Sequence, residues 1–197
     1  MKSDIILAGV GGQGILSIAA TIGMAAVEKD LHLKQAEVHG MSQRGGDVQS
    51  HLRVSSNPIA SDLIPKGKAD IILSVEPMES LRYLPYLSRK GWVVTNTTPF
   101  VNIPNYPEMD EVMAKIAEQP NHIAIDADKI AAEVANKRSS NIVMLGAASH
   151  FIDIEFSALE DGLRKIFERK GDAVVESNIN ALRAGRTATE EILASRN

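Results

Sequence analysis

Apolar residues form short runs that alternate with longer segments of helical spacing. The first run, residues 4–9, ends in glycines and leads into an Ala/Ile/Met-rich segment at 14–29, which predicts a strand, a tight turn and a helix. Residues 33–38 and 48–54 predict two further strands, separated by the polar, glycine-bearing segment 39–47. The chain therefore opens with a strand–turn–helix unit followed by two strands.

The alternation continues through the middle of the chain. Residues 69–75 predict a buried strand, and Glu76-Pro77 begins a helix that extends to residue 87. A strand at 91–96 precedes an irregular segment at 97–107, which contains three prolines. The remaining elements are expected to be a helix at 108–118, a strand at 122–126 and helical structure from 128 onward, including 142–152 and 173–194.

This order of elements predicts an α/β fold of the Rossmann-like, three-layer type. We expect a mostly parallel sheet with helices on both faces and a helical carboxyl-terminal part that covers one side. The strand at 48–54 is expected to be antiparallel, because its connection from 33–38 is too short for a crossover. No segment has the composition of a linker, so residues 1–197 are expected to form one domain.

Composition excludes several classes of partner and chemistry. The 21 basic and 25 acidic residues give a net charge of −4, which offers no footprint for nucleic acid or an anionic membrane. The absence of cysteine excludes disulfides, a thiolate nucleophile and a cysteine-ligated iron–sulfur cluster in this chain. No apolar stretch reaches the roughly 18 residues of a membrane span, and the first residues resemble a strand rather than a signal peptide, so we expect a cytoplasmic location.

The first turn carries a candidate phosphate-binding motif. Gly9-Val10-Gly11-Gly12-Gln13-Gly14 satisfies G-x-G-x-x-G between a strand and a helix, where backbone N–H groups approach an anion. Gly9, Gly11, Gly12, Gln13 and Gly14 are therefore candidate cofactor-binding residues, and the Gln13 amide is suited to reading a polar group. NAD binding is poorly supported, because the acidic residue expected about 20 positions on is matched only by the later Glu37. The alternative is that the glycines only permit close strand–helix packing.

The second motif is E-V-H-G-M-S-Q-R-G-G-D-V at residues 37–48, which collects most types of side-chain donor. G-V-G-G-Q-G precedes it, and segments 65–77, 140–146 and 178–185 follow it in order. With these motifs the chain resembles the gamma-type subunits of the 2-oxoacid:ferredoxin oxidoreductase family, and within it the beta subunits of the indolepyruvate type. The resemblance extends over almost the whole chain.

The resemblance implies a larger partner subunit that carries thiamine diphosphate, magnesium and iron–sulfur clusters. The family's reaction is the oxidative decarboxylation of a 2-oxoacid, here indolepyruvate or another arylpyruvate, with coenzyme A accepting the acyl group and ferredoxin the electrons. This chain would complete the active site and bind no cofactor alone, in agreement with its lack of cysteine. Apolar surface meant for the partner would let the isolated chain form a homodimer.

Four residues of the second motif are candidates for a role in catalysis. Arg44 is the strongest, because its planar guanidinium offers paired donors to a carboxylate or phosphate. His39, Ser42 and Gln43 would add neutral donors. The alternative is that Arg44 and Gln43 bind carbonyls or carboxylates of the partner chain.

Two further polar residues follow predicted strands at the edge where α/β sheets bind ligands. Glu76 and Asn96 are candidate cofactor-binding residues there, with helix capping and turn formation as the respective alternatives. No metal site is expected, since no ligand spacing typical of zinc occurs and His51 alternates within its strand like an exposed residue.

The alternative function belongs to a different class. It is a free-standing Rossmann-type nucleotide-binding protein or NAD-dependent oxidoreductase, which the glycine motif alone would support. Binding of NAD rather than coenzyme A by the purified chain would distinguish it from the subunit interpretation.

Overall fold

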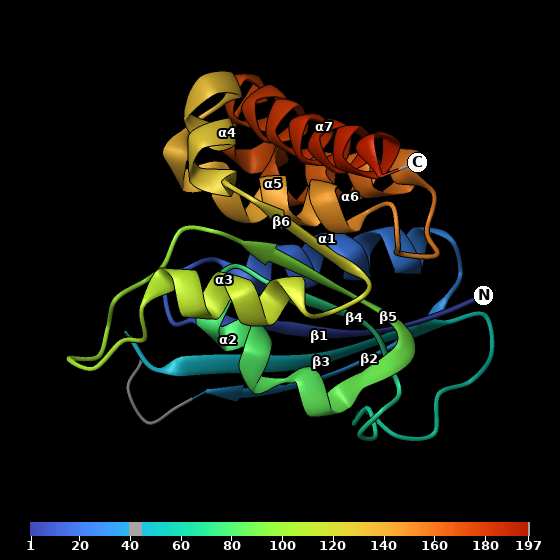
Figure 1. Cartoon of the computed structure of the whole chain (residues 1–197). Coiled ribbons are helices and arrows are strands. Elements are labelled where there is room, and N and C mark those ends of the chain that lie inside the picture. The colour runs from blue at the N-terminus through green and yellow to red at the C-terminus, as the bar shows by residue number, and fades with distance from the viewer. Residues whose placement is uncertain (40–44, 197) are drawn as a thin grey trace.

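The computed structural model describes residues 1–39 and 45–196. Its centre is a six-stranded sheet in the order β2-β3-β1-β4-β5-β6 (Figure 1). The strands are β1 (Lys2–Val10), β2 (His32–His39), β3 (Asp47–Ser55), β4 (Ala69–Ser74), β5 (Leu87–Asn96) and β6 (His122–Ile125). The strands β1, β4, β5 and β6 pair in parallel, as expected where helices make the crossovers.

Strand β3 is antiparallel to both of its neighbours, β1 and β2. The prediction made from the short connection between the second and third strands is therefore confirmed. A consequence that the sequence does not reveal is the position of β2, which lies at the edge of the sheet with β3 between it and β1.

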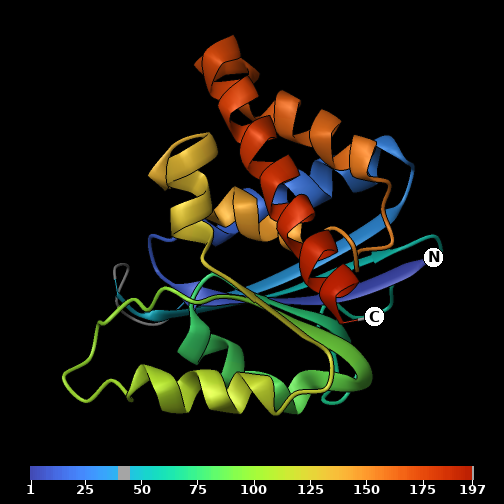
Figure 2. The same ribbon diagram turned by 45° about the horizontal axis from the view of Figure 1, so that its top comes forward.

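Helices cover both faces of the sheet, as predicted. They are α1 (Ile15–Glu28), α2 (Pro77–Arg82), α3 (Met109–Ala117), α4 (Ala127–Val134), α5 (Ser140–Ala148), α6 (Phe156–Phe167) and α7 (Asp172–Ser195), with short 3-10 turns η1 (Leu84–Tyr86), η2 (Lys137–Ser139) and η3 (Glu168–Lys170). Figures 1 and 2 show α1 and α4 to α7 on one face and α2 and α3 on the other. The helical carboxyl-terminal part thus covers one side.

Two predicted helix ends are wrong. The helix expected at 142–152 ends at Ala148, as α5. The helix expected to run from Glu76 to residue 87 ends at Arg82, and β5 begins at Leu87 instead of residue 91. The cause is Pro85, which has no N–H to donate and cannot continue an α-helix, so the chain makes a 3-10 turn instead.

Alternation along the central strands divides the core between the two faces. Ile5 and Leu7 face the helices α1 and α5 within a large continuous apolar cluster. Ile6 and Ala8 point to the other face, where a smaller cluster includes Tyr83. The period of two in a strand buried on both sides explains why β1 reads as an unbroken apolar run.

Helices α5 and α7 cross with their backbones in contact. A Cβ atom added at Gly146 would lie 1.9 Å from the Leu182 carbonyl oxygen, and one added at Gly185 would lie 1.9 Å from the Val143 oxygen. Neither position can hold a side chain unless one helix moves. The glycines therefore determine how closely the two helices pack.

Both described ends of the chain lie at the amino ends of strands. The Met1 amino group donates to the Ser56 hydroxyl, and the Arg196 guanidinium donates to the His122 carbonyl oxygen at 2.9 Å. Figures 1 and 2 show these ends on the same side of the molecule. Within the described residues, no helix combines the length and apolar character that a membrane span requires.

Candidate functional site

The glycine turn joins the carboxyl end of β1 to the start of α1. Gly12 and Gly14 have φ angles of 102° and 80°, in the left-handed region that favours glycine. The Gln13 side chain accepts from the Val10 N–H at 2.8 Å and donates to the Val75 carbonyl at 3.5 Å. Gln13 therefore fixes the turn against the residue that follows β4. The Val75 carbonyl is the polar group that its amide binds.

The five predicted residues of this turn divide into two groups. Gly12, Gln13 and Gly14 line a cavity, whereas Gly9 and Gly11 do not. Gly9 packs so closely that a Cβ there would lie 2.4 Å from a Val75 methyl group, and the Gly11 N–H donates to the Gly46 carbonyl at 2.8 Å. The close-packing interpretation thus applies to Gly9.

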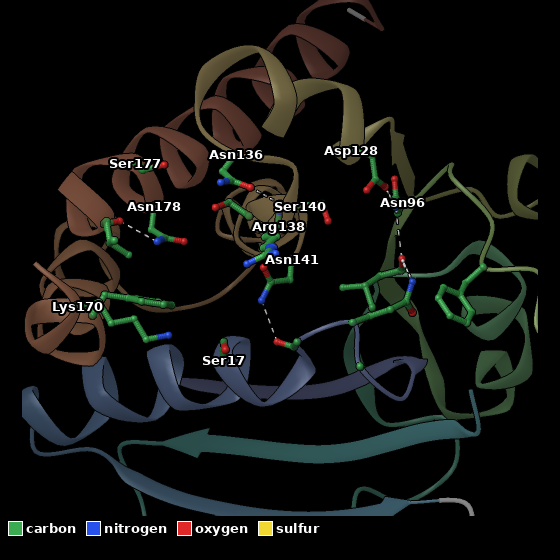
Figure 3. A pocket seen from close by; sticks show the side chains of 18 of the residues that line it. Ser17, Asn96, Asp128, Asn136, Arg138, Ser140, Asn141, Lys170, Ser177 and Asn178 are labelled. Carbon is green, nitrogen blue, oxygen red and sulfur yellow. Dashed lines mark hydrogen bonds between the residues drawn. The ribbon is translucent and has the colours of Figure 1, made fainter. Parts of the chain in front are cut away.

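The cavity has a volume of about 900 Å³ and lies at the carboxyl ends of β4 and β5, between the glycine turn and α7. Figure 3 shows polar side chains from several helices around it. A pocket at this edge, where helices leave the sheet on different sides, is where open α/β sheets bind ligands.

Three helices begin at the wall of the pocket. They are α1, α5 and α7, and residues from the first two turns of each line the cavity. The N-cap residues Gly14, Ser139 and Gly171 make no side-chain cap hydrogen bond. Free N–H groups and the positive ends of three helix dipoles therefore face the same space, which favours an anion.

Two cationic residues add to this potential. Arg138 lies on η2 and Lys170 on η3, and both line the pocket with exposed side chains. In the described part of the chain neither forms an ion pair, and the Lys170 ammonium lies 5.0 Å from the centre of the Phe167 ring. Both charges are therefore available to a ligand.

Asparagines supply neutral groups around the same cavity. The Asn141 amide nitrogen donates to the Gly14 carbonyl at 2.9 Å, and that of Asn178 donates to the Val174 carbonyl at 2.8 Å (Figure 3). These bonds fix the orientation of each amide and leave its oxygen as an acceptor at the pocket. The cavity can therefore accept hydrogen bonds from hydroxyl or amino groups in addition to binding an anion.

Asn96 lines the pocket but makes its hydrogen bonds within the protein. Its amide nitrogen donates to the Asp128 carboxylate at 2.8 Å, and its oxygen accepts from the N–H groups of Thr98 and Ala127. The bond to Thr98 is the turn expected from the sequence, so that interpretation is confirmed. Asn96 joins the end of β5 to the start of α4.

Glu76 does not line the pocket. Its side chain is 0% exposed and accepts from the Glu79 N–H at 2.8 Å, which makes it the N-cap of α2. The capping interpretation is therefore confirmed. The same carboxylate also accepts from the Phe100 N–H and from the Tyr106 hydroxyl.

The polar segment is described only at its ends. Ser42, Gln43 and Arg44 lie outside the described residues, and His39 is the last residue of β2. On the other side, Gly46 accepts from the Gly11 N–H, and Gly45 accepts from the Asn102 amide at 2.5 Å. The start of β3 is thus joined to the glycine turn.

The expectation that His51 is exposed is wrong. Its side chain is 3% exposed, and its Nδ1 accepts from the Ile64 N–H at 3.0 Å. The loop between β3 and β4 folds over this strand, and burial lowers the pKa of His51. Strand alternation alone cannot predict that a loop covers the outward face.

Sequence reasoning missed the cationic and amide lining of the pocket. Asn141 and Asn178 fall in two of the segments that carried the family resemblance, but nothing local indicated a ligand role. Arg138 and Lys170 lie in polar stretches that are typical of solvent-exposed surface. Only the arrangement of α5 and α7 brings these four residues together.

Known proteins resemble this chain over nearly its full length. The family model described as pyruvate ferredoxin/flavodoxin oxidoreductase matches residues 4–188. The indolepyruvate oxidoreductase subunit IorB of Thermococcus kodakarensis is 36% identical, over 96% of this chain and 97% of its own length.

Two solved structures share the fold. One is the keto/oxoacid ferredoxin oxidoreductase gamma subunit of Geobacter sulfurreducens, with a TM-score of 0.72, 21% identity and coverage of 96% of this chain and 99% of that one. The other is the 2-oxoglutarate:ferredoxin oxidoreductase of Magnetococcus marinus, solved with 2-oxoglutarate, coenzyme A and succinyl-CoA bound. It has a TM-score of 0.76 and 23% identity, covering 96% of this chain and 31% of that longer one.

Proposed function

Since this chain belongs to the pyruvate ferredoxin/flavodoxin oxidoreductase family, we propose that it is the cluster-free subunit of a 2-oxoacid:ferredoxin oxidoreductase and that its pocket binds coenzyme A. The 36% identity to a subunit named for indolepyruvate favours an arylpyruvate as the 2-oxoacid. The whole chain, residues 1–197, acts in this proposal as one gamma-type domain of a cytoplasmic enzyme.

The donor set of this chain supports the proposal that the redox and decarboxylation cofactors belong to a larger partner subunit. The chain contains no cysteine for an iron–sulfur cluster. Across residues 1–39 and 45–196, no group of three His, Asp or Glu side chains could hold a metal ion. Thiamine diphosphate with magnesium, when bound by the partner, would supply the decarboxylation chemistry, and clusters there would pass electrons to ferredoxin.

The observation that carries the ligand assignment is the meeting of three helix N-termini with Arg138 and Lys170 at one pocket. Coenzyme A carries a diphosphate and a ribose 3′-phosphate, and such groups bind at helix N-termini and to cationic side chains. The asparagine oxygens would accept from its amino or hydroxyl groups. This chain would thereby hold the acyl acceptor while the partner activates the 2-oxoacid.

The free-standing NAD-dependent alternative is not favoured. In a dinucleotide-binding fold, the acidic residue that binds the ribose follows the strand beside the glycine turn. Here β3 separates β2, and therefore Glu37, from β1 and its glycine turn. A ribose held at the glycine turn would lie away from that acid.

The residues of the polar segment keep their proposed roles. Arg44, with His39, Ser42 and Gln43, would bind either the substrate or the partner subunit. Arg44→Lys keeps the charge but loses the two-pronged geometry, so we expect turnover of the assembled enzyme to fall more than its stability. Unchanged turnover would exclude Arg44 both as a substrate-binding residue and as a contact to the partner subunit.

Binding experiments test the ligand. Coenzyme A and NAD are titrated calorimetrically into the full chain, alone and assembled with its partner. We expect binding of coenzyme A that weakens with added salt, and about a tenfold loss for the double variant Arg138→Ala, Lys170→Ala, which is about 1.4 kcal/mol. The matched control is Lys115→Ala on α3, an exposed cation remote from the pocket lining. NAD binding in preference to coenzyme A would refute the proposal.

An activity assay tests the division between subunits. The chain alone should show no 2-oxoacid oxidation with indolepyruvate, coenzyme A and an artificial electron acceptor, and addition of the larger partner should restore it. Size-exclusion chromatography of the isolated chain tests the proposed homodimer. Turnover by this chain alone would overturn the subunit assignment.

A further inference from the structure

The carboxylate of Glu76 is more deeply buried than a helix cap requires. It is 0% exposed, and within the described residues it forms no ion pair. A buried charge is costly unless hydrogen bonds satisfy it. One oxygen accepts from the Glu79 N–H, whereas the other accepts from the Phe100 N–H at 3.2 Å and the Tyr106 hydroxyl at 2.5 Å. The second oxygen thus serves a different segment of the chain.

That segment is residues 97–108, between β5 and α3. It contains no helix or strand, so few backbone hydrogen bonds fix its position. Its attachments among the described residues include the two bonds to Glu76, the bond from Asn102 to the Gly45 carbonyl and a hydrogen bond between the Tyr106 hydroxyl and the Met78 backbone. Glu76 holds the segment at two points, Phe100 and Tyr106.

Phe100 connects this anchor to the pocket. Phe100 lines the cavity and is 42% exposed, while its N–H donates to Glu76. Burial and the hydrogen bond to Glu76 raise the pKa of Tyr106 above its ordinary value of 10, so the hydroxyl stays a donor. Phe100, which lines the pocket, is therefore hydrogen-bonded to a carboxylate that does not itself line it.

We propose that Glu76 is a positioning residue which, through Tyr106 and the Phe100 amide, holds residues 97–108 so that Phe100 forms a wall of the ligand pocket. The inference rests on the proposed function, in that coenzyme A is the ligand against which the Phe100 wall closes. Loss of the hydrogen bonds to Glu76 frees Phe100 to leave the pocket wall. Binding of coenzyme A then weakens, while the chemistry performed by the partner is unchanged.

The test begins with Tyr106→Phe, which removes one hydroxyl and keeps the ring. In the assembled enzyme, we expect the KM for coenzyme A to rise about fivefold, as for a lost hydrogen bond of about 1 kcal/mol, while kcat and the KM for the 2-oxoacid are unchanged. The matched control is Tyr86→Phe, a partly buried tyrosine on the same face of the sheet that does not contact Glu76.

A double-mutant cycle separates positioning from a merely structural role. Phe100→Ala should raise the same KM, and Tyr106→Phe should add nothing further in that background, because the wall is already absent. A Tyr106→Phe variant that lowers the melting temperature and leaves the KM unchanged would overturn the inference. Independent, additive effects of the two substitutions would overturn it as well.

Failure of the proposed function gives a different pattern. If wild-type protein does not bind coenzyme A, the proposed function fails. Hydrogen exchange of the Phe100 amide then tests separately whether Glu76 positions residues 97–108. Faster exchange in Tyr106→Phe than in Tyr86→Phe supports positioning by Glu76, and equal exchange refutes it. If coenzyme A binds and Lys170→Ala weakens it while Tyr106→Phe does not, only the further inference fails.

Discussion

The two faces of the sheet are held together in different ways. On the face covered by α1 and α4 to α7, one continuous apolar cluster forms the core, and α5 and α7 meet through glycines. On the opposite face the apolar cluster is small, and buried Asp4, His51 and Glu76 take part in fixing irregular segments. Close packing stabilises the first face, whereas buried hydrogen bonds position loops on the second. Substitutions should therefore affect global stability on one face and loop position on the other.

The largest effect is expected at the crossing of α5 and α7. Gly185→Ala places a Cβ 1.9 Å from the Val143 carbonyl oxygen, and neither backbone can yield without separating the helices. We expect a loss of at least about 3 kcal/mol in the free energy of unfolding, at the upper end for overpacking. Chemical denaturation measures it. Thr187→Ala, at an exposed position of the same helix, should stay within about 0.5 kcal/mol. Equal midpoints for the two variants would mean that the helices do not pack this closely.

A smaller loss is expected for the buried ion pair of the opposite face. Arg53 binds the Asp4 carboxylate at 2.7 and 3.1 Å and also donates to the Ser61 and Leu63 carbonyls. Arg53→Met leaves Asp4 buried, although Lys2 still lies 2.8 Å from it, so we expect about 2 kcal/mol rather than the 3 to 5 of a wholly unpaired charge. Arg183→Met, which breaks a more exposed pair with Glu160, is the control and should cost less than about 1 kcal/mol.

The Arg53→Met variant also tests whether buried hydrogen bonds on this face of the sheet position a loop. Limited proteolysis should cut the loop around Ser61 and Leu63 sooner in Arg53→Met, while the control remains resistant. Uniform resistance in both variants would show that the loop is held by other contacts.

The smallest effect is a pH dependence at His51. Burial lowers its pKa from the ordinary 6.5, with Asp62 opposing and Arg53 reinforcing the shift. Between the two pKa values the unfolded chain binds more protons than the folded one. The stabilisation is therefore complete above pH 6.5 and is lost as the pH falls toward the folded value. Denaturation at about pH 7.5 and 5.5 should show a steeper loss in wild type than in His51→Gln. Parallel losses would remove His51 as the cause.

Much of the fold could be predicted because local patterns determine it. The apolar run of β1, the glycines after it and the short connection before β3 gave the first strand, the turn and the antiparallel pairing. The early end of α2 is itself a local effect of Pro85, and a closer reading of that proline would have placed it. The burial of His51 could not be predicted, because it depends on a loop that returns over the sheet.

The site was predicted only in part for the same physical reason. Gly12 and Gly14 carry a local signature, since a tight turn needs left-handed backbone there. Arg138 and Lys170 have none, because their proximity to the glycine turn arises from the packing of α5 and α7. Glu76 follows β4 at the expected edge of the sheet, but its bond from Tyr106, thirty positions later in the chain, has no local signature.

The position of the chain ends has a consequence for gene fusion. Met1 and Arg196 both lie at the amino edge of the parallel strands, whereas the pocket lies at the carboxyl edge. A polypeptide joined at either end would leave the fold without crossing the mouth of the pocket. The same fold accordingly occurs within a polypeptide about three times as long, the Magnetococcus marinus chain of which it covers 31%.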